Sequence, residues 1–134
     1  MHLDGILKNL PALFSALFVA ILFIQSGLDK VLDWKGNLEW LTGHFSKTFV
    51  SGVVPLMLAK ITILELLTGL TAAVGIVYFF VAGSTIVIFY SSILGAATIT
   101  GLFLGQRVAK DYAGAAVLVP YFLLDLIMMF LTSV

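Results

Sequence analysis

The chain has 134 residues, of which 61% are hydrophobic and only 10% are charged, and its formal net charge at pH 7 is zero. A soluble domain of this length could not hide so much apolar surface, so the composition predicts a single membrane-embedded domain over residues 1–134. The balanced charge offers no basic face to nucleic acid. The absence of cysteine excludes disulfides, thiolate catalysis and cysteine-ligated metal or iron–sulfur centres.

Four apolar stretches are long enough to cross a bilayer, which takes about 20 helical residues. They cover approximately residues 10–30, 53–78, 81–105 and 113–133. The expected fold is therefore all-α, an integral membrane four-helix bundle embedded in lipid. The first stretch ends without an Ala-x-Ala cleavage pattern, so we expect a retained span and not a signal peptide. The aromatic residues 78–80, followed by Gly83, predict a tight hairpin between the second and third spans.

The segment between the first two spans has a helical pattern of its own. Its apolar residues recur at spacings typical of one helical face. These residues are Trp34, Leu38, Leu41 and Phe45. The pattern predicts an amphipathic interfacial segment, which could lie in the headgroup plane or cap the mouth of the bundle. Both alternatives place it over the same end of the bundle.

The basic residues near the span ends predict the orientation. Five of them fall in the first and third loops, whereas Lys8 alone lies on the side of the termini. The five are Lys30, Lys35, Lys47, Arg107 and Lys110. The positive-inside rule then places both loops in the cytoplasm and both termini on the periplasmic side.

Two carboxylates, Glu65 and Asp125, lie near the middle of the second and fourth spans. A charged residue at a helix centre costs roughly 2.5–3.5 kcal/mol on insertion scales, so such residues usually face the interior and have a role. Each lies 12 residues into its span, which predicts a common depth roughly 18 Å from the span start. Gln25 and Tyr90 lie in the other two spans, so each span could contribute one polar group to a shared proton or quinone pocket.

Three roles are open for the two carboxylates. They could share a proton and relay it, or accept one from a quinol-like ligand. Lys60, near the start of the second span, could neutralise one of them or extend outward to the headgroups. They could also be neutral and hydrogen-bond across helices as polar contacts. For Glu65 a functional and a structural role are equally compatible with the pattern, and Asp125 fits the structural role better.

Small residues at four-residue spacing predict close helix packing. Ala97, Gly101 and Gly105 form one such series, and Gly69 with Ala73 forms another. We expect these residues and Gly27 to hold the bundle together, with a homodimer interface as the alternative. His2 and His44 both lie outside the spans, which excludes a haem held by two intramembrane histidines and leaves no metal site.

Two motifs resemble the DoxX-like family of four-helix membrane proteins. Residues 23–34, FIQSGLDKVLDW, are similar to its phenylalanine–glycine–lysine signature. Residues 65–69, ELLTG, resemble its glutamate-x-x-x-glycine core, and residues 105–114 are similar to loops of bacterial members. The resemblance implies a bacterial inner-membrane protein, in a family that includes small subunits proposed to pass electrons to quinone. The residues it singles out are Gly27, Lys30, Glu65, Gly69 and Arg107.

The expected function is that of a small subunit in a larger membrane complex linked to quinone or respiratory electron transfer. It would anchor a partner, with Lys30, Lys60 and Arg107 at the mouth able to hold an anion or a partner's carboxylate. No catalytic or cofactor site of its own is visible, and a quinone or lipid could bind at an interface. The alternatives are a proton-coupled homodimeric transporter that uses Glu65, and a purely structural subunit.

Overall fold

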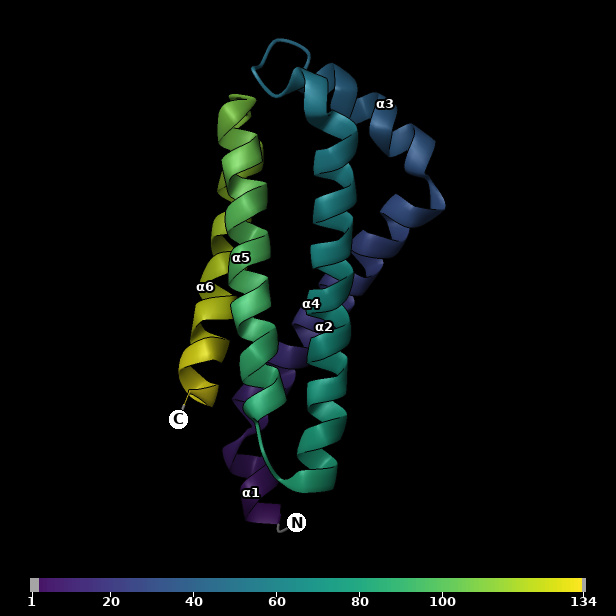
Figure 1. Cartoon of the computed structure of the whole chain (residues 1–134). Coiled ribbons are helices and arrows are strands. Elements are labelled where there is room, and N and C mark those ends of the chain that lie inside the picture. Colours follow the sequence, from purple (N-terminus) through teal and green to yellow (C-terminus); the bar gives the residue numbers. More distant parts are fainter. Residues whose placement is uncertain (1–2, 134) are drawn as a thin grey trace.

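The computed structural model describes residues 3–133, so His2 lies outside the described part. These residues form helices almost throughout (Figure 1). The helices are α1 (Leu3–Lys8), α2 (Leu10–Leu32), α3 (Trp34–His44), α4 (Val54–Ala82), α5 (Ile86–Val108) and α6 (Tyr112–Thr132), with a 3₁₀ turn at Ser51–Val53. Four of them, α2, α4, α5 and α6, are long and apolar enough to cross a membrane. By this measure the chain is an integral membrane protein.

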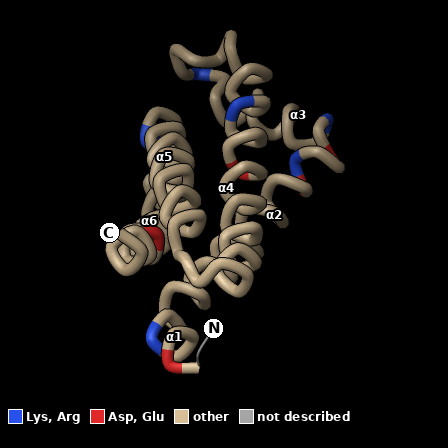
Figure 2. Tube along the Cα trace, turned by 60° about the horizontal axis from the view of Figure 1, so that its bottom comes forward, with Lys and Arg blue, Asp and Glu red and all other residues tan. Residues whose placement is uncertain are grey.

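The four long helices pack side by side. Helix α2 packs against α4, α4 against α5, and α5 against α6, and α6 also contacts α2. Figure 2 shows that Lys, Arg, Asp and Glu gather at the helix ends and in α1 and α3, which leaves the middle of the long helices mostly uncharged. This distribution is what a bilayer requires, because it keeps charged groups near the headgroups.

The turn between α4 and α5 lies later in the chain than the sequence indicates. Residues 78–80 belong to the last turns of α4, which ends only at Ala82, and α5 begins at Ile86. Gly83 ends α4 with φ 73°, and its N–H donates to the carbonyl of Phe79 at 2.7 Å. Glycine adopts this left-handed conformation without strain, so the position of Gly83 and not that of the aromatic residues determines where the helix stops.

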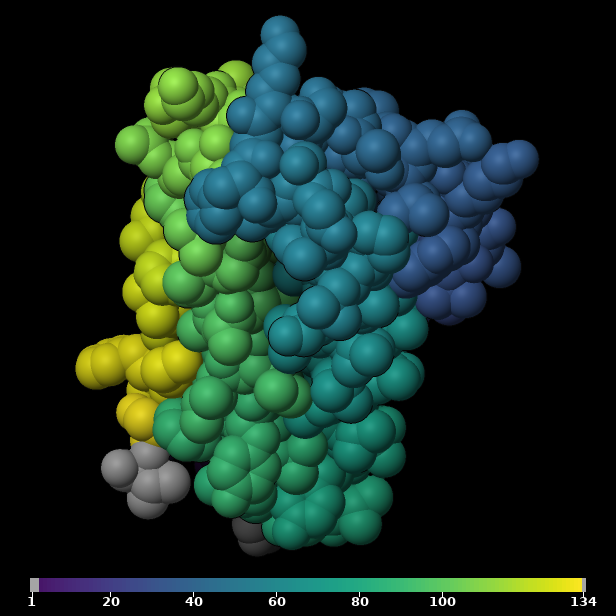
Figure 3. All heavy atoms as spheres, turned by 45° about the horizontal axis from the view of Figure 1, so that its top comes forward, coloured from purple at the N-terminus to yellow at the C-terminus, as the bar shows by residue number. Residues whose placement is uncertain are grey.

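Helix α3 follows α2 directly and turns back over the end of the long helices. Asp33 ends α2 and also caps α3, since its side chain accepts a hydrogen bond from the N–H of Gly36 at 3.3 Å. Helix α3 packs against α2 and α4. Viewed from this end, α3 and the segment after it lie across the ends of α4 and α5 (Figure 3). Phe45, at the end of α3, is buried there.

A pair of threonines joins α4 to α5. The hydroxyls of Thr68 and Thr98 lie 3.1 Å apart and are fully buried, and each also lies 2.7 Å from a carbonyl of its own helix. Each hydroxyl has one proton, so one of them must leave its own carbonyl to bond the other. We expect a double-mutant cycle with Thr68→Val and Thr98→Val, followed by unfolding in detergent, to give a coupling of only about 0.6 kcal/mol. A coupling of zero would show that the two hydroxyls do not bond.

Candidate functional site

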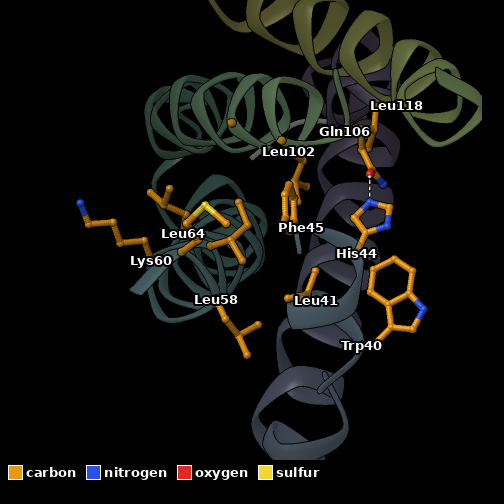
Figure 4. Close-up of a pocket in the computed structure, with 14 residues that line it drawn as sticks. Trp40, Leu41, His44, Phe45, Leu58, Lys60, Leu64, Leu102, Gln106 and Leu118 are labelled. Carbon is orange, nitrogen blue, oxygen red and sulfur yellow. Dashed lines mark hydrogen bonds between the residues drawn. The ribbon is translucent and has the colours of Figure 1, made fainter. Parts of the chain in front are cut away.

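A pocket of about 320 Å³ lies beneath α3 (Figure 4). Its walls are mostly apolar and come from α3, α4, α5 and α6. The lining residues are Trp40, Leu41, His44, Phe45, Met57, Leu58, Lys60, Ile61, Leu64, Gly101, Leu102, Gly105, Gln106 and Leu118. This volume is at the lower end of the range for small-molecule sites, so it suits one ring or a short chain.

Two glycines on α5 create the hollow. A Cβ atom at Gly101 would meet nothing within 4 Å, and one at Gly105 would meet only the Phe45 ring, at 3.6 Å. Ala97, in the same series, is exposed. The expectation that Ala97, Gly101 and Gly105 pack helices together within the chain is therefore wrong. Spacing alone could not reveal this, because Gly101 and Gly105 lie on a face of α5 that is separated from the neighbouring helices by the pocket.

Other glycines make the close helix contacts. A Cβ atom added to any of them would lie within 3.0 Å of a neighbouring helix. The pairs in contact are Gly27 with Leu66, Gly69 with Ile24, Gly75 with Ile88, and Gly95 with Asp125. The packing expected for Gly27 and Gly69 is thus present, at the contact between α2 and α4.

The polar edge of the pocket centres on His44. Its Nε2 lies 2.9 Å from Oε1 of Gln106 and 3.8 Å from Oδ2 of Asp111. The ring also stacks on Trp40, with centroids 4.5 Å apart. Because Oε1 of Gln106 can only accept, Nε2 of His44 carries the proton in this bond. The amide N–H groups of Gln106 then remain as donors near the pocket.

Asp111 reaches this edge because it caps α6. Its Oδ1 accepts a hydrogen bond from the N–H of Gly114 at 2.9 Å. An aspartate at this position satisfies a free N–H of the first turn. The side-chain ends of Asp111 and Gln106 also lie close to Gly114: a Cβ there would be 2.7 Å from Oδ2 of Asp111 and 2.8 Å from Nε2 of Gln106, so both ends would have to shift. The start of α6 therefore positions the polar edge.

Glu65 pairs with Lys30, and not with Asp125 or Lys60. Its Oε1 lies 2.7 Å from Nζ of Lys30, with side chains 2% and 18% exposed, respectively. Lys30 also donates to the hydroxyl of Ser26 at 2.9 Å. Lys30 is consequently not free at the mouth. Lys60 is exposed and lines the pocket, and its side chain extends away from His44 in Figure 4.

The two buried carboxyls also lie at different depths. The bond between Thr68 and Thr98 places these residues at one level. Glu65 precedes Thr68 by three residues, toward the α3 end, whereas Asp125 contacts Gly95, three residues from Thr98 toward the hairpin. At 1.5 Å per residue the offset is about 9 Å. The expectations of a common depth and a shared proton are therefore wrong, because the helices start at different heights.

Gln25 and Tyr90 do not contribute to an interior pocket. Gln25 is exposed, and its amide donates to Asp29 at 3.3 Å. Tyr90 is 53% exposed, whereas its neighbours Ser91 and Ser92 are buried. Their helix register turns both side chains outward. The sequence shows that each span carries a polar group, but it does not show which face of the helix that group occupies.

Arg107 remains at the surface near the start of α6. Its guanidinium lies over the ring of Tyr112, 4.5 Å from the centroid, and the side chain is exposed. This leaves the charge of Arg107 accessible for a contact outside the chain.

Asp125 is fully buried, and neither of its carboxyl oxygens has a hydrogen-bond partner within residues 3–133. The structural role expected for it, a hydrogen bond to a hydroxyl on another helix, is not seen there. Glu65, by contrast, has its charge balanced by Lys30.

Four of the five residues singled out by the family resemblance meet at one place, and Arg107 lies apart from them. Gly27, Lys30, Glu65 and Gly69 all lie along the contact between α2 and α4. Comparison with protein-family models, characterised proteins and solved structures gives no match.

His44 and Gln106 are the site residues that the sequence did not single out for a binding role. They are 62 positions apart, and no local spacing joins them. The available signal was that His44 lies near the end of the segment predicted to be amphipathic, which was expected to cover one end of the long helices.

Proposed function

We propose that this protein binds the head group of a quinone in the pocket beneath α3, as a small subunit of a membrane redox complex. The observation that carries the proposal is the combination of apolar walls with one polar edge, made by His44 and Gln106. A quinone has the same character, because its flat apolar ring carries two carbonyl oxygens. Any redox centre that exchanges electrons with the quinone belongs to another subunit.

The pocket offers matching contacts for such a ring. Trp40 and Phe45 supply aromatic surface, and the amide N–H groups of Gln106 can donate to a quinone carbonyl. A volume of about 320 Å³ holds one ring, and the isoprenoid tail would extend into the lipid beside the exposed Gly101. Asp111, next to His44, could stabilise a positive charge on the imidazole if a hydroquinone donated to it.

The proposal includes a four-helix membrane bundle in which α3 is an amphipathic helix at the interface. In support, Trp40 is exposed and Trp34 partly so, at the same end of the bundle, and tryptophan is enriched at the headgroup level. The excess of basic residues in the first and third loops supports an orientation in which this end faces the cytoplasm of a bacterial cell and the termini face the periplasm. The quinone head group would then enter from the cytoplasmic leaflet.

Membership of the DoxX-like family is part of the same proposal. It is supported by the meeting of Gly27, Lys30, Glu65 and Gly69 at one helix contact. Of the three basic residues expected to contact a partner at the mouth, Arg107 and Lys60 are exposed and remain available for an acidic partner subunit. A transporter that couples protons through Glu65 is less favoured, because Lys30 holds that carboxylate.

Quinone binding can be measured by the fluorescence of Trp40. The chain has two tryptophans, so Trp34→Phe leaves Trp40 as the only one. We expect a short-tailed ubiquinone or menaquinone analogue to quench it saturably in detergent micelles. In this background Gly101→Phe should fill the pocket and weaken binding by about tenfold or more, roughly 1.4 kcal/mol. Gly101→Ala, which meets no atom within 4 Å, is the matched control.

Quenching that rises linearly with quinone and is the same in both Gly101 variants would reflect partitioning into the micelle and would contradict the proposal. The complex is tested separately. Affinity purification from gently extracted native membranes should recover redox subunits in fixed ratio, and a homodimer without them would contradict the role as a subunit.

A further inference from the structure

We propose that Asp125 is a proton-binding site of the membrane domain, separate from the pocket beneath α3. Its carboxyl group would hold a proton between α5 and α6 and release it when α6 moves. This assigns to Asp125 the proton-coupling role that the sequence offered to Glu65.

The carboxyl group of Asp125 is shielded from solvent and has no hydrogen-bond partner in the described chain. The residue is 0% exposed, and neither oxygen has a hydrogen-bond partner in the described chain. It faces Gly95 of α5, where the missing side chain leaves the space that the carboxyl fills. A carboxyl group that holds two helices together would be hydrogen-bonded to one of them. This carboxyl group is not, so the arrangement suits a group that gains and loses a proton.

No charged group faces Asp125 from the helices packed against it. Helix α6 packs against α5 and α2. The only charged residue of α5 is Arg107, near its last residue, and the charged residues of α2 are Asp29 and Lys30, near its last residue as well. The tyrosines of these helices are Tyr90 of α5 and Tyr112 of α6, both exposed, and Tyr121, also on α6. An unpaired charge in such surroundings is very costly, and a bound proton removes it.

A proton fits this position better than a metal ion does. Metal ions such as Mg²⁺ and Ca²⁺ need about six or more oxygen ligands. Residues 3–133 contain no group of three His, Cys, Asp or Glu side chains that could hold a metal ion. The hydroxyls of Ser91 and Ser92, one turn before Gly95 on α5, already donate to carbonyls of their own helix, at 2.6 and 2.5 Å. A proton needs only one lone pair of the carboxylate.

Helix α6 has the features that would let Asp125 exchange its proton. Pro120 lies inside the helix, five residues before Asp125. It has no N–H to bond the preceding turn, so α6 can bend there. An apolar cavity of about 310 Å³ between α5 and α6 adjoins this region and gives α6 room to shift. Its lining residues are Ile99, Thr100, Phe103, Leu118, Val119 and Phe122.

Carbodiimide labelling tests whether Asp125 carries a proton. Dicyclohexylcarbodiimide enters membranes and reacts with a carboxylic acid, whose proton moves to a carbodiimide nitrogen while the carboxyl oxygen bonds to the central carbon. We expect mass spectrometry of the full-length protein in liposomes at neutral pH to find the adduct on Asp125. Glu65, which is paired with Lys30, is the internal control and should stay unlabelled.

Infrared spectroscopy supplies a second readout that does not depend on reagent access. The wild-type protein should show the C=O stretch of a buried carboxylic acid, which raising the pH should remove reversibly while the helical content stays constant. Asp125→Asn, which has nearly the same shape, should lack both the band and the adduct.

Labelling of Glu65 without Asp125, or an acid band that survives in Asp125→Asn, would overturn the proposal. An acid band that does not respond to pH while the fold persists would also overturn it, because a permanently neutral carboxyl is only a packing group. Gly101→Phe fills the other pocket and should leave the labelling of Asp125 unchanged, so the outcome is independent of quinone binding.

Discussion

Replacing Lys30 with methionine is expected to destabilise the protein by about 3–5 kcal/mol, because it leaves the buried carboxylate of Glu65 without its partner. The carboxylate lies 2.7 Å from Nζ of Lys30 and is almost completely buried. Methionine keeps the apolar stem of the side chain, so the loss of stability measures the effect of removing the charge. Since Lys30 is 18% exposed, we expect the lower part of this range, measured by thermal or denaturant unfolding in detergent.

The double variant Lys30→Met/Glu65→Leu should recover most of the loss, because no unpaired charge then remains. Lys35→Met removes an exposed lysine from α3 and is the matched control, with an expected change within about 0.5 kcal/mol. If the double variant were as unstable as Lys30→Met, the loss would come from packing and not from the unpaired carboxylate.

Gly69→Ala is expected to cost about 1–3 kcal/mol, although it adds a single methyl group. The new Cβ would lie 2.7 Å from the backbone nitrogen of Ile24. A backbone atom cannot rotate away, so α2 would have to move as a whole. This would also strain the ion pair between Lys30 and Glu65, which lies one turn from Gly69.

Gly101→Ala makes the same chemical change on a long apolar helix but meets no atom within 4 Å. It should leave the unfolding midpoint unchanged or raise it slightly, because alanine is the better helix former. The difference between the two variants isolates the contact between α2 and α4. Equal midpoints would show that α2 and α4 do not approach as closely as the structure has them.

Hydropathy and length were enough to predict four apolar helices, because a bilayer-spanning helix must be long and uniformly apolar. Because these helices are apolar on all sides, the sequence does not show which face of each helix packs inward. Gly69 and Gly101 both belong to series of small residues at four-residue spacing, yet one touches a backbone and the other lines a pocket. Nothing in an all-apolar helix distinguishes its inner face from its outer face.

The ion-pair partner of Glu65 also could not be identified from the sequence pattern. Lys60 is on the same helix, and the sequence offered it as the counter-charge. Lys30 is 35 residues away and lies within 2.7 Å because α2 and α4 are antiparallel. Choosing between Lys60 and Lys30 requires knowing how far α2 is shifted against α4 along the helix axes. The local sequence pattern does not give this shift. The pocket depends on such a shift in the same way, since His44 and Gln106 meet only in the folded chain.

Asp33 serves as both the last cap of α2 and the first cap of α3, with no spacer between the helices. Because a single residue joins the two helices, we expect a tilt of α3, which covers the pocket, to be passed on to α2, which carries Lys30. A ligand that raises α3 would therefore be sensed at the ion pair, three residues before Asp33. We expect the quinone analogue to change the difference in unfolding midpoint between the wild-type protein and Lys30→Met. Inserting two glycines after Asp33 should uncouple α3 from α2 and abolish that change.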